Sequence, residues 1–137
     1  MSEEHPTIDA QVTFLYTTDL DSTTPFYSDT LGLELAYEQP SARFYYVGPS
    51  SFIGIVFARP GRHVEPKGVV FTLLTSDVDG WYQHLMNRGA TPLGPPKLGQ
   101  NAYTFFIQDP NGYLIEFQQF VDPKWPGPKG IQEQITK

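Results

Sequence analysis

The chain has 137 residues, of which 39% are hydrophobic and 18% are charged, a size and composition that fit one domain with a hydrophobic core and exclude global disorder. Nine Lys and Arg against fifteen Asp and Glu give a net charge of −6, which argues against nucleic-acid binding and favours a cationic ligand. There is no cysteine, so disulfides, thiolate nucleophiles and zinc–thiolate sites are excluded.

Residues 1–10 are predicted to form a polar, acidic N-terminal tail. They lack the basic and apolar regions of a secretory signal, and no part of the chain has the run of about 20 apolar residues that a membrane helix needs. We therefore expect a cytoplasmic protein with no membrane partner.

The first predicted module covers residues 11–58. It opens with a β-rich run, after which Thr24 is expected to cap a helix that has Pro25 at its first position and ends at Gly32. Three strands follow, at 34–37, 43–47 and 52–58. Residues 59–68 are polar and broken by two prolines, which predicts a linker.

The second predicted module covers residues 69–120. Asp77 is a candidate cap for a helix that ends at Gly89 and has Val78, Trp81 and Leu85 on one face. Strands are expected at 91–93, 103–108 and 113–120, with a long proline-rich loop within 91–101 and a hairpin turn at 109–112. Residues 121–137 are expected to be a C-terminal tail, held only where Trp125 finds an apolar surface.

An internal repeat links the two modules. The run 12–21 aligns with the run 70–79 at an offset of 58 residues, and five of the ten positions are identical. Asp19 and Asp77 occupy equivalent places, which explains them as turn and helix-cap residues rather than as a catalytic carboxylate pair. The predicted fold is therefore of the α+β class, with two tandem βαβββ modules.

The pattern resembles the vicinal oxygen chelate superfamily, which includes glyoxalase I, bleomycin-resistance proteins and extradiol dioxygenases. The resemblance covers about residues 11–120. It is carried by Asp19-Leu20, Phe26-Tyr27 and Leu31-Gly-Leu33 in the first half, and by Asp109-Pro-Asn-Gly-Tyr-Leu-Ile-Glu-Phe117 in the second. It implies a curved mixed sheet around a cavity in a single domain, and pairing as a homodimer.

In metal-using members of that superfamily, four strand positions carry His, Glu or Gln ligands. The motifs place these positions at Val12, Val56, Val70 and Glu116, and valine cannot bind a metal. The resemblance therefore implies no metal and no cofactor. One alternative is a divalent ion such as Mg²⁺ held through Glu116, since Mg²⁺ needs few protein carboxylates. Another is a set of ligands that the motifs misplace, at Gln11, Gln108 or Gln118.

Side chains near these positions are the predicted lining of the ligand cavity. The residues alone favour core packing or a solvated sheet face for most of them, and the resemblance is what favours contact with a ligand. The predicted lining residues are Val12, Phe14, Tyr16, Val56, Val70, Thr72, Leu74, Tyr103, Phe105, Leu114 and Gln118. His5, His63 and His84 fall at no ligand position and are expected at the surface.

Two classes of function follow from the resemblance. In the first, the chain is a metal-free protein that binds a small aromatic or cationic molecule in an apolar cavity, as bleomycin-resistance proteins do. In the second, it is an enzyme of the same superfamily. Such an enzyme is either a metal-dependent lyase or dioxygenase, or a cofactor-free catalyst with Glu116 as general acid or base.

Overall fold

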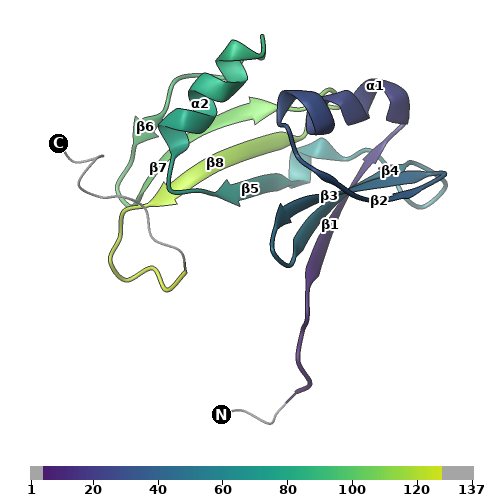
Figure 1. Ribbon diagram of the computed structural model, residues 1–137, viewed down its shortest axis with the longest axis horizontal. Helices are drawn as coiled ribbons and strands as arrows, with labels where there is room; N and C mark the ends of the chain where they lie inside the picture. The colour runs from purple at the N-terminus through teal and green to yellow at the C-terminus, as the bar shows by residue number, and fades with distance from the viewer. Residues whose placement is uncertain (1–4, 128–137) are drawn as a thin grey trace. The chain divides into compact units, whose positions relative to one another are not determined.

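The computed structural model describes residues 5–127 and contains two four-stranded mixed sheets (Figure 1). The chain divides into two compact units between residues 64 and 65, and each unit contains one sheet. In both sheets the first and fourth strands of the unit pair in parallel, and the third and second strands follow in antiparallel order. The predicted α+β class and βαβββ order are confirmed.

The first unit buries one face of its sheet under a short helical segment. Its elements are β1 (Gln11–Thr17), α1 (Leu20–Pro25), the π-helical turn η1 (Phe26–Thr30), β2 (Leu35–Gln39), β3 (Ala42–Gly48) and β4 (Ser51–Phe57). Tyr27 from η1 is fully buried, and its ring stacks on Tyr45 of β3 at a centroid distance of 6.1 Å. Ile53 and Ile55 of β4 complete this core.

The helix of the first unit begins earlier than predicted. Its N-cap is Asp19, whose carboxylate accepts a hydrogen bond from the Ser22 amide at 3.2 Å, so the expected cap at Thr24 is wrong. Thr24 lies inside α1 and its hydroxyl donates to the Leu20 carbonyl. Pro25 closes α1 instead of opening it, because it has no amide to continue the ladder and the chain widens into the π-turn of η1.

The second unit repeats this plan with a longer helix. Its elements are the 3₁₀ turn η2 (Pro66–Gly68), β5 (Val70–Leu74), α2 (Val78–Asn87), β6 (Lys97–Leu98), β7 (Ala102–Gln108) and β8 (Leu114–Phe120). As predicted, the Asp77 carboxylate caps α2 by accepting from the Gly80 amide at 2.9 Å. α2 packs on β7 and β8 through Val78, Trp81 and Leu85 (Figure 1).

The proline-rich segment after α2 forms less strand than predicted. No strand forms at 91–93, and the edge strand of this sheet is the two-residue β6. Prolines at 92, 95 and 96 have no amide to donate to a ladder, so this stretch cannot pair continuously with β7. The Leu93 amide still donates to the Phe106 carbonyl at 2.9 Å, which holds the segment against the sheet edge.

The predicted hairpin turn joins β7 to β8. Gly112 has a φ of +89°, which a side chain would oppose, and its amide donates to the Asp109 carbonyl at 3.0 Å. After β8, the ring of Trp125 stacks on Phe120 at 4.1 Å. The rest of the predicted C-terminal tail, residues 128–137, lies outside the described residues, as do residues 1–4. Within residues 5–127, no helix has both the length and the apolar character to cross a membrane.

Candidate functional site

The second sheet turns one face to α2 and leaves the other open. Alternation and strand pairing place three rows of side chains on the open face, each row crossing β5, β8 and β7. Val70 and Leu74 are 53% and 41% exposed there. The rows are Val70, Leu114 and Gln108; Thr72, Glu116 and Phe106; and Leu74, Gln118 and Thr104. Each row contains both apolar and polar side chains, and Glu116 is the only charged residue in the three rows.

Glu116 is the centre of this open face. Its two carboxylate oxygens each accept one hydroxyl hydrogen bond, from Thr72 at 2.8 Å and from Thr104 at 2.9 Å. A carboxylate has about four acceptor positions, so these two bonds orient Glu116 and leave further positions for a ligand. Within residues 5–127 no cationic side chain forms an ion pair with it. Glu116 is therefore a half-buried, oriented carboxylate without a counter-ion.

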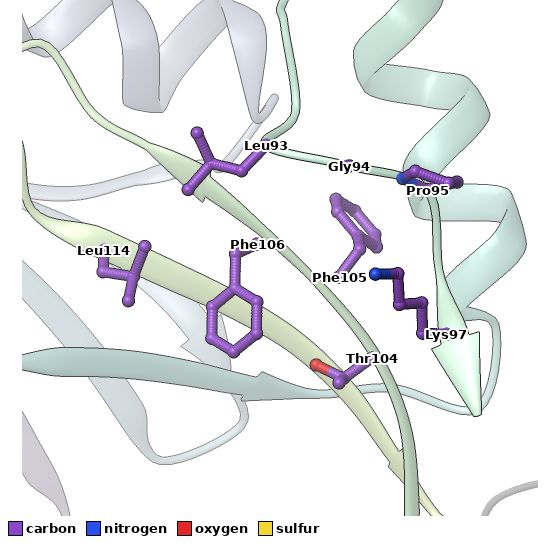
Figure 2. Close-up of a pocket in the computed structure, with 8 residues that line it drawn as sticks. All are labelled: Leu93, Gly94, Pro95, Lys97, Thr104, Phe105, Phe106 and Leu114. Atoms are coloured by element: carbon purple, nitrogen blue, oxygen red, sulfur yellow. The ribbon is translucent and has the colours of Figure 1, made fainter. Parts of the chain in front are cut away.

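The proline-rich segment forms a pocket against β7 and β8, the two inner strands of this sheet (Figure 2). The pocket has a volume of about 370 Å³. Leu93, Gly94, Pro95 and Lys97 come from the segment, and Thr104, Phe105, Phe106 and Leu114 come from β7 and β8. The loop predicted at 91–101 thus lines a cavity beside the row that contains Glu116.

Tyr103 and Phe105 lie on the opposite face of β7 from Glu116. Phe105 is 2% exposed and its ring stacks on Phe117, beneath α2, while one side of it reaches the pocket of Figure 2. The Tyr103 hydroxyl donates to the Asp79 carboxylate at 2.5 Å, near the start of α2. Their expected places on the open face belong instead to Thr104 and Phe106. In the sequence, the polar residues Thr104 and Gln108 could have indicated that the even-numbered residues of β7 lie on the open face.

The contact between Tyr103 and Asp79 predicts that the folded protein loses stability at alkaline pH. Burial, together with the hydrogen bond to Asp79 and its negative charge, raises the pKa of Tyr103 from 10.0 to about 12. Because the folded state keeps this proton longer than the unfolded state, the contribution to stability is complete below pH 10 and is lost as pH rises to about 12. We expect the stability difference between the wild type and Tyr103→Phe to shrink across this window in urea titrations.

Tyr37→Phe, which removes an exposed phenol of the first unit, is the matched control. Burial also raises the pKa of Tyr45, and that effect is present in all three proteins and cancels in the difference. A wild-type advantage over Tyr103→Phe that stays constant from pH 9 to about 12 would contradict the prediction.

The open face of the first sheet is aromatic. Val12, Phe14 and Tyr16 share it, as predicted, because Leu15 and Thr17, which alternate with them along β1, are buried on the other face. Phe14 is 46% exposed, and its ring meets Phe44 edge to face at 5.6 Å. No carboxylate lies in the strand positions of this face.

Strand register places the first-unit counterpart of Glu116 at Gly54 and not at Val56. Glu116 pairs with Thr72 of β5 and Phe106 of β7, and Gly54 pairs with Phe14 of β1 and Phe44 of β3 in the same way. The offset between the two positions is 62 residues, longer than the 58 of the first strands. A Cβ at Gly54 would stand 2.8 Å from the Phe14 ring, so the ring occupies the space that a side chain would need.

The side chains around Glu116 do not suit a resident metal ion. In the second unit Val70 cannot bind a metal, and the Thr72 and Thr104 hydroxyls donate their protons to Glu116. In the first unit, the positions equivalent to Val70 and Glu116 are Val12 and Gly54, neither of which offers a ligand. Among residues 5–127 no group of three His, Asp or Glu side chains comes together. The three glutamines that were alternative ligand candidates lie on three different strands. Gln118 shares the open face of the second sheet with Glu116, and Gln108 lies beside Leu114 on that face. Gln11 is at the start of β1, and its side-chain amide donates to the Thr13 hydroxyl. His5 and His63 are exposed, and His84 contacts Trp81.

Comparison with protein families identifies one match that spans most of the chain. The model described as "Glyoxalase/Bleomycin resistance protein/Dioxygenase superfamily" matches residues 9–117. The chain is also 26% identical over 113 residues to biphenyl-2,3-diol 1,2-dioxygenase 3 of Rhodococcus globerulus. That match covers 76% of this chain and 59% of the dioxygenase.

Solved structures have the same fold. A glyoxalase/bleomycin resistance protein/dioxygenase from Nocardioides is 25% identical, with a TM-score of 0.69 and coverage of 94% of this chain and 93% of that one. TnmS3, an antibiotic binding protein from Streptomyces sp. CB03234, is 25% identical, with a TM-score of 0.72 and coverage of 85% and 99%. A lactoylglutathione lyase from Agrobacterium tumefaciens is 22% identical, with a TM-score of 0.70 and coverage of 90% and 100%, which shows the shared fold alone.

Proposed function

The chain belongs to the Glyoxalase/Bleomycin resistance protein/Dioxygenase superfamily, and from this premise we propose that it is a metal-free protein that binds a small aromatic or cationic molecule. The observation that carries the proposal is Glu116, an oriented carboxylate with no counter-ion among the described residues, on a sheet face where its other neighbours are apolar or uncharged. A carboxylate in such surroundings attracts a cation more strongly than it would in open water.

The proposed ligand face consists of the open face of the second sheet. Val70 and Leu74 supply exposed apolar surface on either side of Thr72, and Phe106 adds an aromatic ring in the same row as Glu116. A planar apolar ligand buries surface against these side chains, while a positive group pairs with Glu116. The resemblance to an antibiotic binding protein supports a binding role.

A matched pair of probes tests the proposal. We expect 10-methylacridinium, a planar cation, to bind more tightly than acridine, its uncharged analogue at neutral pH, as measured by fluorescence titration. Glu116→Gln keeps the side-chain shape and removes the charge, and it is expected to reduce the preference for the cation by about tenfold. Glu65→Gln, which removes an exposed carboxylate of the same unit, is the control for net charge.

Two results would contradict the proposal. One is equal binding of both probes by the wild type, and the other is an unchanged preference in Glu116→Gln. Pairing as a homodimer and a cytoplasmic location belong to the same proposal and stay predictions, the first to be measured by light scattering on the purified chain.

The similarity to a dioxygenase favours an enzyme as the second candidate. Because the chain spans 59% of that relative's length, the relative's activity is a hypothesis here. In this alternative Glu116 acts as a general acid or base, or ligates the metal of a lyase or dioxygenase-like enzyme. Metal analysis by plasma mass spectrometry, after dialysis against Mg²⁺, Mn²⁺, Fe²⁺, Ni²⁺ and Zn²⁺, separates the candidates, since a tightly held stoichiometric ion would contradict a metal-free binder.

A further inference from the structure

The first unit contains a pocket that the proposed function does not use. Its volume is about 250 Å³, and it lies between the open face of the sheet and the turn at 59–62. Its lining includes Phe14, Tyr16, Phe44 and Val56 from the sheet, and Arg59 and Arg62 from the turn. Every lining residue belongs to the first unit, so the pocket is complete within that unit.

The turn fixes the backbone of both arginines. The Arg59 amide donates to the Arg62 carbonyl at 3.0 Å, and the Arg62 amide donates back to the Arg59 carbonyl at 2.8 Å. Pro60 and Gly61 occupy the two central positions, and Gly61 has a φ of +83°, the combination that a type II turn requires. A short closed turn of this kind presents two guanidinium-bearing side chains at one rim of the pocket.

The floor and one wall of the pocket are apolar. Ala42 and Val56, on the open face, are 2% and 8% exposed and form a closed floor. The rings of Phe14 and Phe44 meet at an interplanar angle of 80° beside it, and Gly54 leaves the room that the Phe14 ring occupies. An aromatic ligand can therefore stack or meet these rings edge to face.

The charge of the pocket is opposite to that of the whole chain. No carboxylate lines it, and within residues 5–127 neither Arg59 nor Arg62 forms an ion pair. One N–H group of Arg62 donates to the Tyr16 hydroxyl at 3.0 Å, which directs this guanidinium along the sheet. A guanidinium has five N–H donors, so both arginines retain donors for a ligand. Two unneutralised cations beside an apolar floor, in a chain of net charge −6, form a site for an anion.

We infer that this pocket binds a planar aromatic oxyanion, with its ring against Phe14 and Phe44 and its carboxylate or phosphate at Arg59 and Arg62. Carboxylate and phosphate share the geometry that guanidinium recognises in a bidentate way. The volume falls just below the range of about 300–1,000 Å³ that drug-sized ligands occupy, which favours a ligand of one or two rings. This site takes the opposite charge from the Glu116 face and does not depend on it.

Naphthalene derivatives of one shape and different charge test the inference. We expect 1-naphthoate and 1-naphthyl phosphate to bind at least about tenfold more tightly than neutral 1-naphthamide, as measured by calorimetry at moderate salt. The double variant Arg59→Gln/Arg62→Gln is expected to lose this preference while it retains weak binding of the amide. Lys67→Gln/Arg88→Gln, which removes two exposed charges of the second unit, controls for net charge.

The stronger of the two anions identifies the ligand class as carboxylate or phosphate. Equal affinity for the anions and the amide, an unchanged preference in the double variant, or no binding of either anion would overturn the inference. Glu116→Gln is expected to bind 1-naphthoate as the wild type does, so a failure here and a failure of the proposed cation site give different results. Circular dichroism of the double variant checks that the exposed substitutions leave the fold intact.

Discussion

Replacement of Phe117 by alanine is expected to destabilise the protein by about 3–5 kcal/mol, the largest effect of any single change proposed for this chain. Phe117 is completely buried, between Phe105 at a centroid distance of 5.1 Å and Trp81 at 4.9 Å. These rings come from β8, β7 and α2, so the truncated side chain leaves a cavity where three elements meet. Neighbouring rings cannot fill it without leaving their own stacked arrangement.

Urea unfolding followed by fluorescence measures this loss, because Trp81 reports directly on the cavity. Typical domains are stable by about 5–15 kcal/mol, so the variant is expected to unfold at much lower urea concentrations. Phe106→Ala is the control, since Phe106 lies next to Phe105 in sequence but on the open, half-buried face. A Phe106→Ala loss as large as that of Phe117→Ala would show that the two faces of β7 and β8 are assigned wrongly.

Replacement of Asp109 by alanine is expected to cost about 2–4 kcal/mol. Asp109 is 5% exposed, and one carboxylate oxygen accepts from the amides of Asn111 and Tyr113, each at 2.8 Å. The variant removes the carboxylate that accepts both hydrogen bonds just before β8, where Tyr113 is buried. Hydrogen bonds to a charged acceptor are worth more than neutral ones, which sets the size of the loss.

Asp109→Asn separates charge from geometry at this turn. Its amide oxygen can accept the same hydrogen bonds, so a loss well below that of the alanine variant is expected in thermal unfolding. An Asn variant as unstable as the Ala variant would mean that the negative charge, rather than the acceptor positions, holds the turn. An Ala variant that matched the wild type in stability would exclude these hydrogen bonds as a determinant of the hairpin.

The order of elements was predictable because short-range signals agree with each other. The repeat at 12–21 and 70–79, the cap at Asp77 and the turn before Gly112 each depend on a few adjacent residues, and the structure confirms all three. The start of the first helix was not predictable from Pro25, because proline suits both the first turn of a helix and its last residue. Only the Asp19 side chain distinguishes the two.

The faces of the strands were harder to predict where apolar residues occupy both of them. Phe105 and Phe106 are adjacent and equally apolar, so the burial of one and not the other is decided by α2, a contact distant in sequence. The place of Gly54 was missed for a different reason. No single offset relates the two halves, because the first strands differ by 58 residues and the fourth strands by 62, with a longer connection before β7 in the second unit. A glycine inside an apolar strand is itself the signal for a close approach.

The contrast between Gly54 with Phe14 and Glu116 with Thr72 limits how the two halves of such a protein can diverge. At this ladder position in the first unit, the large Phe14 ring leaves no room for a side chain at position 54. At the same position in the second unit, the Glu116 carboxylate has the small Thr72 side chain beside it. Any mutational route between the two arrangements therefore has an order. A side chain at position 54 requires a smaller residue or a different rotamer at position 14 first. Once one module of a duplicated pair carries the large ring, the ring opposes the return of a side chain at the neighbouring position, whatever ligand selection later favours.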